Sequence, residues 1–69
     1  MVIMVLKEEH MENRATEIRK LTGLSQRRFA EKYGIPRRTI ENWEMGVSTA
    51  PDYVLNMLER IVREDEKQD

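Results

Sequence analysis

The segment 24–46, LSQRRFAEKYGIPRRTIENWEMG, constrains the fold of this chain more than any other part of it. Ser25 is a good N-cap, and the pattern that follows it predicts a helix over residues 26–33. Gly34 ends that helix, because glycine adopts a positive φ without steric penalty. A proline, which suits the first turn, then opens a second predicted helix over residues 36–45. The segment therefore predicts two short helices joined by a tight turn.

Apolar residues recur in this segment where two crossed helices would touch. Ala30 offers a small side chain at the crossing, and Ile35 follows the turn as a core residue. Ile40 and Trp43, three positions apart, form the inner face of the second predicted helix. Trp43 could instead stack on a nucleic-acid base, but its spacing from Ile40 favours the core.

The sequence predicts one helix before this segment and another after it. Asn13 is a candidate cap for a helix over residues 14–21. The predicted buried face of that helix repeats every three residues: Ala15, Ile18 and Leu21. Pro51 opens the last predicted helix, with Ser48 or Thr49 as its cap. The predicted buried stripe of the last helix follows the i, i+3, i+4, i+7 pattern: Val54, Leu55, Leu58, Ile61 and Val62.

A chain of 69 residues is one domain, and this pattern makes it all-α. We expect a compact bundle of four helices, or of five if the residues ahead of the bundle add one. The predicted bundle spans residues 13–64, and a charged, frayed tail follows over 65–69. Residues 1–12 form an N-terminal extension. Its apolar run, Val2–Leu6, suits an arm that packs on a partner, a short strand or an extra helix.

The composition excludes several classes of protein. Cysteine is absent and His10 is the only histidine, so the usual ligands of a zinc site are missing. The run Val2–Leu6 is too short to cross a bilayer and lacks the basic segment of a signal peptide. The sequence has neither a plausible Ser–His–Asp set nor a phosphate-binding glycine loop, so these patterns do not indicate an enzyme. We therefore expect a cytoplasmic protein with no catalytic activity, metal, cofactor or membrane partner.

The formal net charge of −1 hides a strong asymmetry along the chain. Residues 1–13 carry a net charge of −2, residues 14–38 carry +6, and residues 39–69 carry −5. A basic middle between acidic ends favours a polyanionic partner such as DNA or RNA. The alternative is that these charges only solvate the outer faces of helices.

Several positions taken together resemble the phage repressor/Cro-like (Xre) helix-turn-helix family. The resemblance spans about residues 14–63. The matching residues are Gln26, Ala30, Gly34, Ile35, Ile40, Trp43, Glu44, Gly46 and Pro51. It implies a repressor-like, DNA-binding, four-helix domain with a central helix-turn-helix. Family members often carry Ser or Thr where this chain has Pro36, so a phosphate contact at that position is in doubt.

The resemblance implies that the helix over 36–45 lies in the major groove of double-stranded DNA. The implied base-contacting residues are Arg37, Arg38, Glu41 and Asn42, on the face opposite Ile40 and Trp43. Arginine can donate two hydrogen bonds to guanine, asparagine can pair with adenine, and glutamate can accept from cytosine. Glu41 lies one turn from Arg37, so it could instead pair with Arg37 and orient it.

Phosphate contacts are implied around the start of the helix over 26–33 and in the loop after the second helix. The expected residues are Gln26, Arg27, Arg28, Thr39, Gly46, Val47 and Ser48. In the loop we expect backbone N–H groups to be the donors, and at Gln26 the helix dipole favours an anion. Three further bases contribute only to the electrostatic field: Arg14, Arg19 and Lys20.

These features lead to one leading hypothesis and one alternative. The first is a sequence-specific transcriptional regulator, expected to act as a repressor and of bacterial or phage type. A single unit offers a small DNA interface, so we expect a homodimer on two half-sites, with part of the last helix as the dimer seam. The alternative is an antitoxin or phage accessory protein that acts mainly by binding a protein such as a toxin. The apolar run and the acidic ends motivate this alternative.

Overall fold

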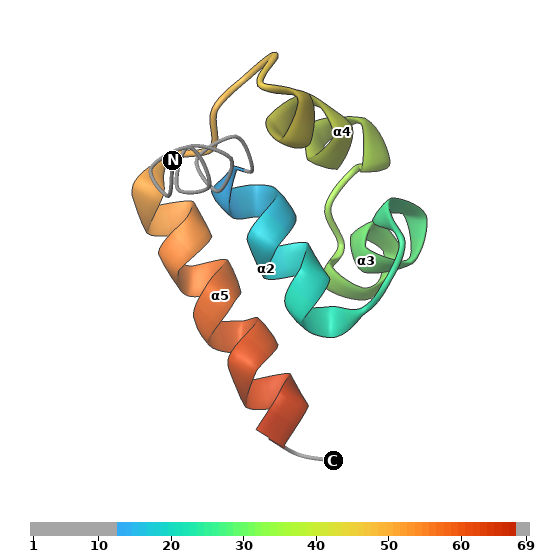
Figure 1. Cartoon of the computed structure of the whole chain (residues 1–69), viewed down its shortest axis with the longest axis vertical. Coiled ribbons are helices and arrows are strands. Elements are labelled where there is room, and N and C mark those ends of the chain that lie inside the picture. The colour runs from blue at the N-terminus through green and yellow to red at the C-terminus, as the bar shows by residue number, and fades with distance from the viewer. Residues whose placement is uncertain (1–12, 68–69) are drawn as a thin grey trace, which may run out of the picture.

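The computed structural model describes residues 13–67, which form an all-α bundle (Figure 1). Over this range there are no strands. The four helices are α2 (Arg14–Thr22), α3 (Gln26–Tyr33), α4 (Arg37–Met45) and α5 (Asp52–Lys67). The predicted fold class is therefore confirmed. The expectations for the N-terminal extension lie outside the described residues. Helix α5 continues through Lys67, into the segment where a frayed tail was predicted.

The starts of the helices follow the sequence prediction closely but not everywhere. The Asn13 side chain accepts the N–H of Thr16 at 3.0 Å, which confirms it as the cap of α2. Ser25 caps α3 in the same way through the N–H of Arg28, at 3.2 Å. Helix α4 starts one residue later than predicted, because Pro36 has an extended ψ of 136° and stands at the N-cap.

The predicted cap of the last helix is wrong. Pro51 lies directly before α5, and its carbonyl accepts the N–H groups of Val54 and Leu55 at 3.0 and 3.2 Å. Proline occupies the cap position, so Ser48 and Thr49 lie too far back in the loop to cap this helix. This leaves both hydroxyl side chains in an exposed connection between α4 and α5.

Each of the first three helices ends at a glycine in the left-handed region, Gly23, Gly34 and Gly46, and for Gly34 this confirms the sequence prediction. The turn between α3 and α4 depends most on this. Gly34 has φ 68° and its N–H donates to the carbonyl of Ala30. Ile35 then donates to the same carbonyl at 3.0 Å, which closes the turn. Any other L-residue at Gly34 would be strained by about 1 kcal/mol or more.

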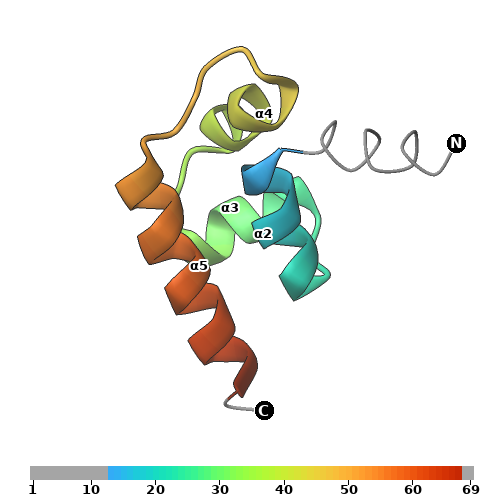
Figure 2. The same ribbon diagram turned by 60° about the vertical axis from the view of Figure 1, so that its left-hand side comes forward.

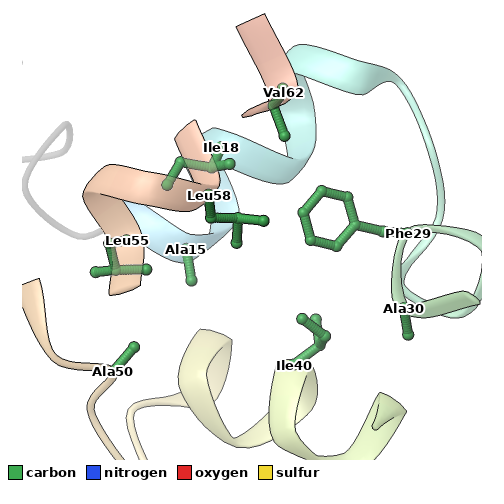
Figure 3. Close-up of a cluster of buried hydrophobic side chains, with 9 residues drawn as sticks. All are labelled: Ala15, Ile18, Phe29, Ala30, Ile40, Ala50, Leu55, Leu58 and Val62. Carbon is green, nitrogen blue, oxygen red and sulfur yellow. The ribbon is translucent and has the colours of Figure 1, made fainter. Parts of the chain in front are cut away.

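Side chains from all four helices converge on a single core (Figure 3). Phe29 of α3 and Ile40 of α4 point toward Ile18 of α2 and Val62 of α5, and all four are essentially inaccessible to solvent. Trp43 packs against the edge of this core, as its spacing predicted.

Two predicted core residues are exposed, and Val54 is only half-buried. Leu21 is 41% exposed and Ile61 is 50% exposed. Leu21 lies in the last turn of α2, beside the charged side chain of Arg63. Ile61 precedes the fully buried Val62 and is therefore turned about 100° away from the core. The apolar stripe of α5 is thus wider than the face that the bundle covers.

Helix α2 is the centre of the arrangement. It packs against each of the other three helices, whereas α3 packs mainly against α4. Figures 1 and 2 show α5 along one side of α2, with its C-terminal turns projecting beyond the other helices. The orientation of α4 is therefore determined by its contacts with α2 and α3.

Candidate DNA-binding site

Helix α4 divides into an inner and an outer face. Ile40 is buried and Trp43 packs on the core, while Arg37 and Arg38 are exposed at the first turn. The other two predicted base-contacting residues, Glu41 and Asn42, are half-buried beside them. The structure therefore places all four of these side chains on one face of α4, from its first turn to its middle and away from the core.

The two arginines of this face differ in their availability. Arg37 Nε lies 3.0 Å from Glu41 Oε2, one turn along the helix, so the expected pairing of these residues is present. Arg38 makes no hydrogen bond or ion pair with any residue of the range 13–67. Of the two, Arg38 is therefore the guanidinium that a ligand could engage without breaking an existing contact.

The start of α4 carries further unused donors. Pro36 provides no side-chain cap, and its carbonyl accepts the N–H groups of Thr39 and Ile40. Within the described part of the chain, the N–H groups of Arg37 and Arg38 have no acceptor. Because the positive end of the helix dipole lies here too, this end of α4 favours an anionic ligand.

The start of α3 adds a second group of polar and basic side chains. Arg27 Nε makes an exposed ion pair with Glu31 at 3.4 Å, and Arg28 is exposed without an ion pair in the described residues. Gln26 uses one amide hydrogen to reach Glu44 Oε1 at 3.1 Å, which ties the start of α3 to the end of α4.

A shallow hollow joins these two groups. It is lined by residues of α3, of the turn and of the start of α4, including Arg27, Gly34, Pro36 and Arg37. The hollow therefore brings Arg27 of the predicted phosphate-contacting set close to Arg37 of the predicted base-contacting set. Thr39 is half-buried, with its N–H engaged by the carbonyl of Pro36.

The loop after α4 differs from the expectation. The N–H groups of Val47 and Ser48 both donate to the carbonyl of Asn42, at 2.9 and 3.3 Å. The N–H of Gly46 donates to the carbonyl of Trp43 at 3.3 Å. These N–H groups are therefore already engaged at the end of α4, and the phosphate contact of the loop stays a prediction. The side chain of Ser48 remains exposed.

A helix-turn-helix family model matches residues 16–61, from the first turn of α2 into α5. The chain belongs to the Xre/Cro-like helix-turn-helix family. No curated protein and no solved structure matches it. Membership makes this chain a DNA-binding regulator, in a family that is typically non-enzymatic.

Two further structural findings concern the described residues. No helix within residues 13–67 is long and apolar enough to span a bilayer. Over the same range, no cluster of three acidic or histidine side chains could hold a metal ion.

A charged pair at the back of the helix-turn-helix was missed by sequence reasoning. Arg19 of α2 donates two hydrogen bonds to the carboxylate of Glu44 of α4, from Nε to Oε2 at 2.7 Å and from Nη2 to Oε1 at 3.0 Å. A third bond joins Arg19 to the carbonyl of Leu24 at 2.9 Å. Arg19 was expected only to contribute to the electrostatic field, and this expectation is wrong. The two residues lie 25 positions apart, and nothing in the local pattern connects them.

The ionisation of Glu44 reflects these contacts. Burial alone would raise the pKa of its carboxyl group, but hydrogen bonds from Arg19 and Gln26 outweigh burial and lower the pKa. The hydrogen bond to Glu44 likewise raises the pKa of Arg19. Both groups therefore stay charged and hold α2, α3 and α4 together behind the exposed face of the helix-turn-helix.

Proposed function

We propose that the protein is a sequence-specific transcriptional repressor that reads the major groove of double-stranded DNA with α4. The observation that carries this proposal is the exposed, unpaired Arg38 at the start of α4. A major groove admits one α-helix, and the N-terminal residues of a recognition helix contact base edges. A repressor needs only to occupy its operator, and this face of the molecule would provide the contacts to do so.

The base contacts would come from four side chains with different chemistry. Arg38 would donate to guanine, and Asn42 would pair with adenine through its donor and acceptor. Arg37 and Glu41 would act as a pair, since their existing ion pair limits where the Arg37 guanidinium can point. Each good bidentate contact would contribute roughly 1–3 kcal/mol of discrimination.

The phosphate contacts would flank these base contacts. At the start of α3 the donors would be Gln26, Arg27 and Arg28, together with the N–H groups of that first turn. Thr39 would add a hydroxyl beside α4. From the loop Gly46–Ser48, the Ser48 hydroxyl would be the donor, while Gly46 and Val47 would bring backbone close to the strand.

A homodimer would explain the surplus apolar surface of α5. Tyr53, Met57 and Ile61 are 67%, 52% and 50% exposed, and their i, i+4, i+8 spacing puts them on one face. Because one module buries only roughly 600–1,000 Å² on DNA, strong operator binding favours two copies. The two α4 helices would then read half-sites about 34 Å apart, one turn of the duplex.

The decisive experiment is selection of duplexes from a random library, followed by affinity measurements on Arg38→Ala and Lys67→Ala. Each substitution removes one exposed positive charge, but Lys67 lies at the far end of α5. We expect the wild type to select a palindromic site. Arg38→Ala should then lose roughly 5- to 150-fold on that site, which corresponds to 1–3 kcal/mol. Lys67→Ala should stay close to the wild type, and equal losses in both variants would contradict base reading by Arg38.

A second candidate function is supported by the same exposed stripe on α5. In an antitoxin or phage accessory protein, a protein such as a toxin would cover Tyr53, Met57 and Ile61 instead of a second copy. Sedimentation over a range of concentrations separates the two. A dimer that Met57→Lys converts to a monomer favours the repressor, and a monomer throughout favours the protein partner.

A further inference from the structure

One amide side chain joins the beginning of α2 to the end of α4. Asn13 Oδ1 accepts the N–H of Thr16 at 3.0 Å and so caps α2. Its Nδ2 donates to the carbonyl oxygens of Trp43 and Glu44, at 2.6 and 3.0 Å. The acceptor and both donors of the Asn13 amide are therefore used at once, across a separation of about thirty residues.

The last turn of α4 needs the donors that Asn13 supplies. The last carbonyl groups of a helix have no partner within it. In the loop after α4, the N–H groups of Val47 and Ser48 both donate to the carbonyl of Asn42. The N–H of Gly46 donates to the carbonyl of Trp43. For the carbonyl of Glu44, Asn13 is the donor within the described residues. The end of α4 is thus completed by a side chain from another helix.

The position of this contact gives it influence over the DNA-facing end of α4. Asn13 and Arg19 both hold α4 near its C-terminus, whereas Arg37 and Arg38 project at its N-terminus. Helix α4 has nine residues and is roughly 13 Å long. A tilt of a few degrees at the held end would displace Arg38 by roughly 1 Å, beyond the ~0.5 Å to which functional side chains must be held.

We propose that Asn13 is a positioning residue for the recognition helix: its amide fixes the orientation of α4 and thereby sharpens base discrimination without touching DNA. This inference rests on the proposed function, because it assumes that α4 reads the bases. It adds the capping residue of α2 to the determinants of specificity. The two roles of the amide, as acceptor for α2 and donor for α4, can be separated by substitution.

Two variants remove the donor and keep the cap. Asn13→Asp has the same shape and retains an acceptor for the N–H of Thr16, but it places a carboxylate beside the carbonyls of Trp43 and Glu44. Asn13→Ser also caps helices well and leaves the net charge unchanged. The matched control is Thr22→Val, which removes bonds to the carbonyl of Arg19 (2.6 Å) and from the N–H of Leu24 (3.0 Å). Those two bonds do not involve α4.

The measurement is the affinity of each variant for the selected site and for a scrambled duplex, at a temperature where circular dichroism shows complete folding. We expect both Asn13 variants to lose roughly tenfold on the selected site, the worth of one or two hydrogen bonds, and little on the scrambled one. Thr22→Val should keep the wild-type ratio of the two affinities. An unchanged ratio in both Asn13 variants would overturn the proposal, since a merely structural residue affects stability alone.

Trp43 gives a second readout that needs no DNA. It is the only tryptophan of the chain, and it lines a small pocket together with Asn13. Its emission should change in both Asn13 variants and not in Thr22→Val. If the wild type selects no duplex, the proposed function fails, and unchanged Trp43 emission would then also refute the coupling of Asn13 to α4. If the emission of Trp43 changes but the ratio of the two DNA affinities does not, Asn13 is coupled to α4 without positioning it for base reading, and the proposal is wrong.

Discussion

At the C-terminal end of α4 the polar groups are engaged within the protein, whereas at its N-terminal end several donors face solvent. Asn13, Arg19 and Gln26 all bond to residues 43–44. Arg38, by contrast, has no partner in the described residues, and Pro36 leaves the first turn without a side-chain cap. One short helix thus has a held end and an available end. The difference indicates that the C-terminal end of α4 fixes the position of the helix, while donors at its N-terminal end remain free to bind a ligand.

The largest effect should come from releasing the held end. Glu44 is only 8% exposed in its side chain and Arg19 is 19% exposed, so Glu44→Ala leaves a largely buried guanidinium without its carboxylate. We expect a loss of about 3 kcal/mol in the free energy of unfolding, the lower end of the range for buried pairs. Urea denaturation followed by circular dichroism measures it.

The exposed pair between Arg27 and Glu31 provides the control for that experiment. Its N–O distance is 3.4 Å and both side chains are largely solvated. Glu31→Ala should therefore cost less than about 0.5 kcal/mol. If the two substitutions cost the same, Glu44 does not anchor α4, and the contrast between the two ends of the helix is wrong.

At the available end, the N-terminus of α4, a substitution can add a contact instead of removing one. Pro36→Ser would give α4 the side-chain cap that it lacks, whereas Pro36→Ala removes the ring and adds nothing. Serine should exceed alanine by about 1 kcal/mol in the free energy of unfolding, because its hydroxyl can accept the N–H of Arg38, which has no acceptor in the described residues. The loss of the rigid ring offsets this by about 0.4–1 kcal/mol, so Pro36→Ser should resemble the wild type. Thermal unfolding of the three proteins measures these differences.

The same pair of variants tests whether the start of α4 approaches DNA. A hydroxyl at position 36 could also reach a phosphate, so Pro36→Ser should bind operator and scrambled duplexes more tightly than Pro36→Ala, by the same factor for both. Equal affinities of the two variants would mean that this end of α4 stays away from the backbone of the duplex.

The contrast between the two ends also explains what the sequence could predict. Residues of the available end, such as Arg38, are placed by helical period alone, once Ile40 is known to face the core. The glycine stops at Gly34 and Gly46 are local as well. Arg19–Glu44 and Asn13–Trp43 depend on how helices distant in sequence cross, and no local pattern encodes a crossing.

Two further features of the structure could not be predicted from the apolar pattern. Ile61 fits the apolar period of α5, but the covered face of that helix is narrower than the apolar stripe. The N–H groups of Val47 and Ser48 looked available because the loop is exposed, yet both fold back onto the carbonyl of Asn42. Periodicity predicts which face of a helix is apolar, but how much of that face is covered, and which N–H groups are already bonded, follows only from the structure.

The smallest expected effect is the loss of stability when Glu44, at the held end of α4, becomes protonated at low pH. Hydrogen bonds lower the pKa of Glu44 in the folded protein below its ordinary value of 4.5. Its contribution to stability is therefore fully present above pH 4.5, and it is lost as the pH falls through the lowered pKa. Glu44→Gln keeps an oxygen acceptor but cannot titrate, so the wild type should exceed this variant in stability at pH 7. The two should converge well below pH 4.5. Denaturation curves at pH 7, 4.5 and 3 measure this, and a difference that does not change with pH would show that the charge on Glu44 contributes nothing to holding α4.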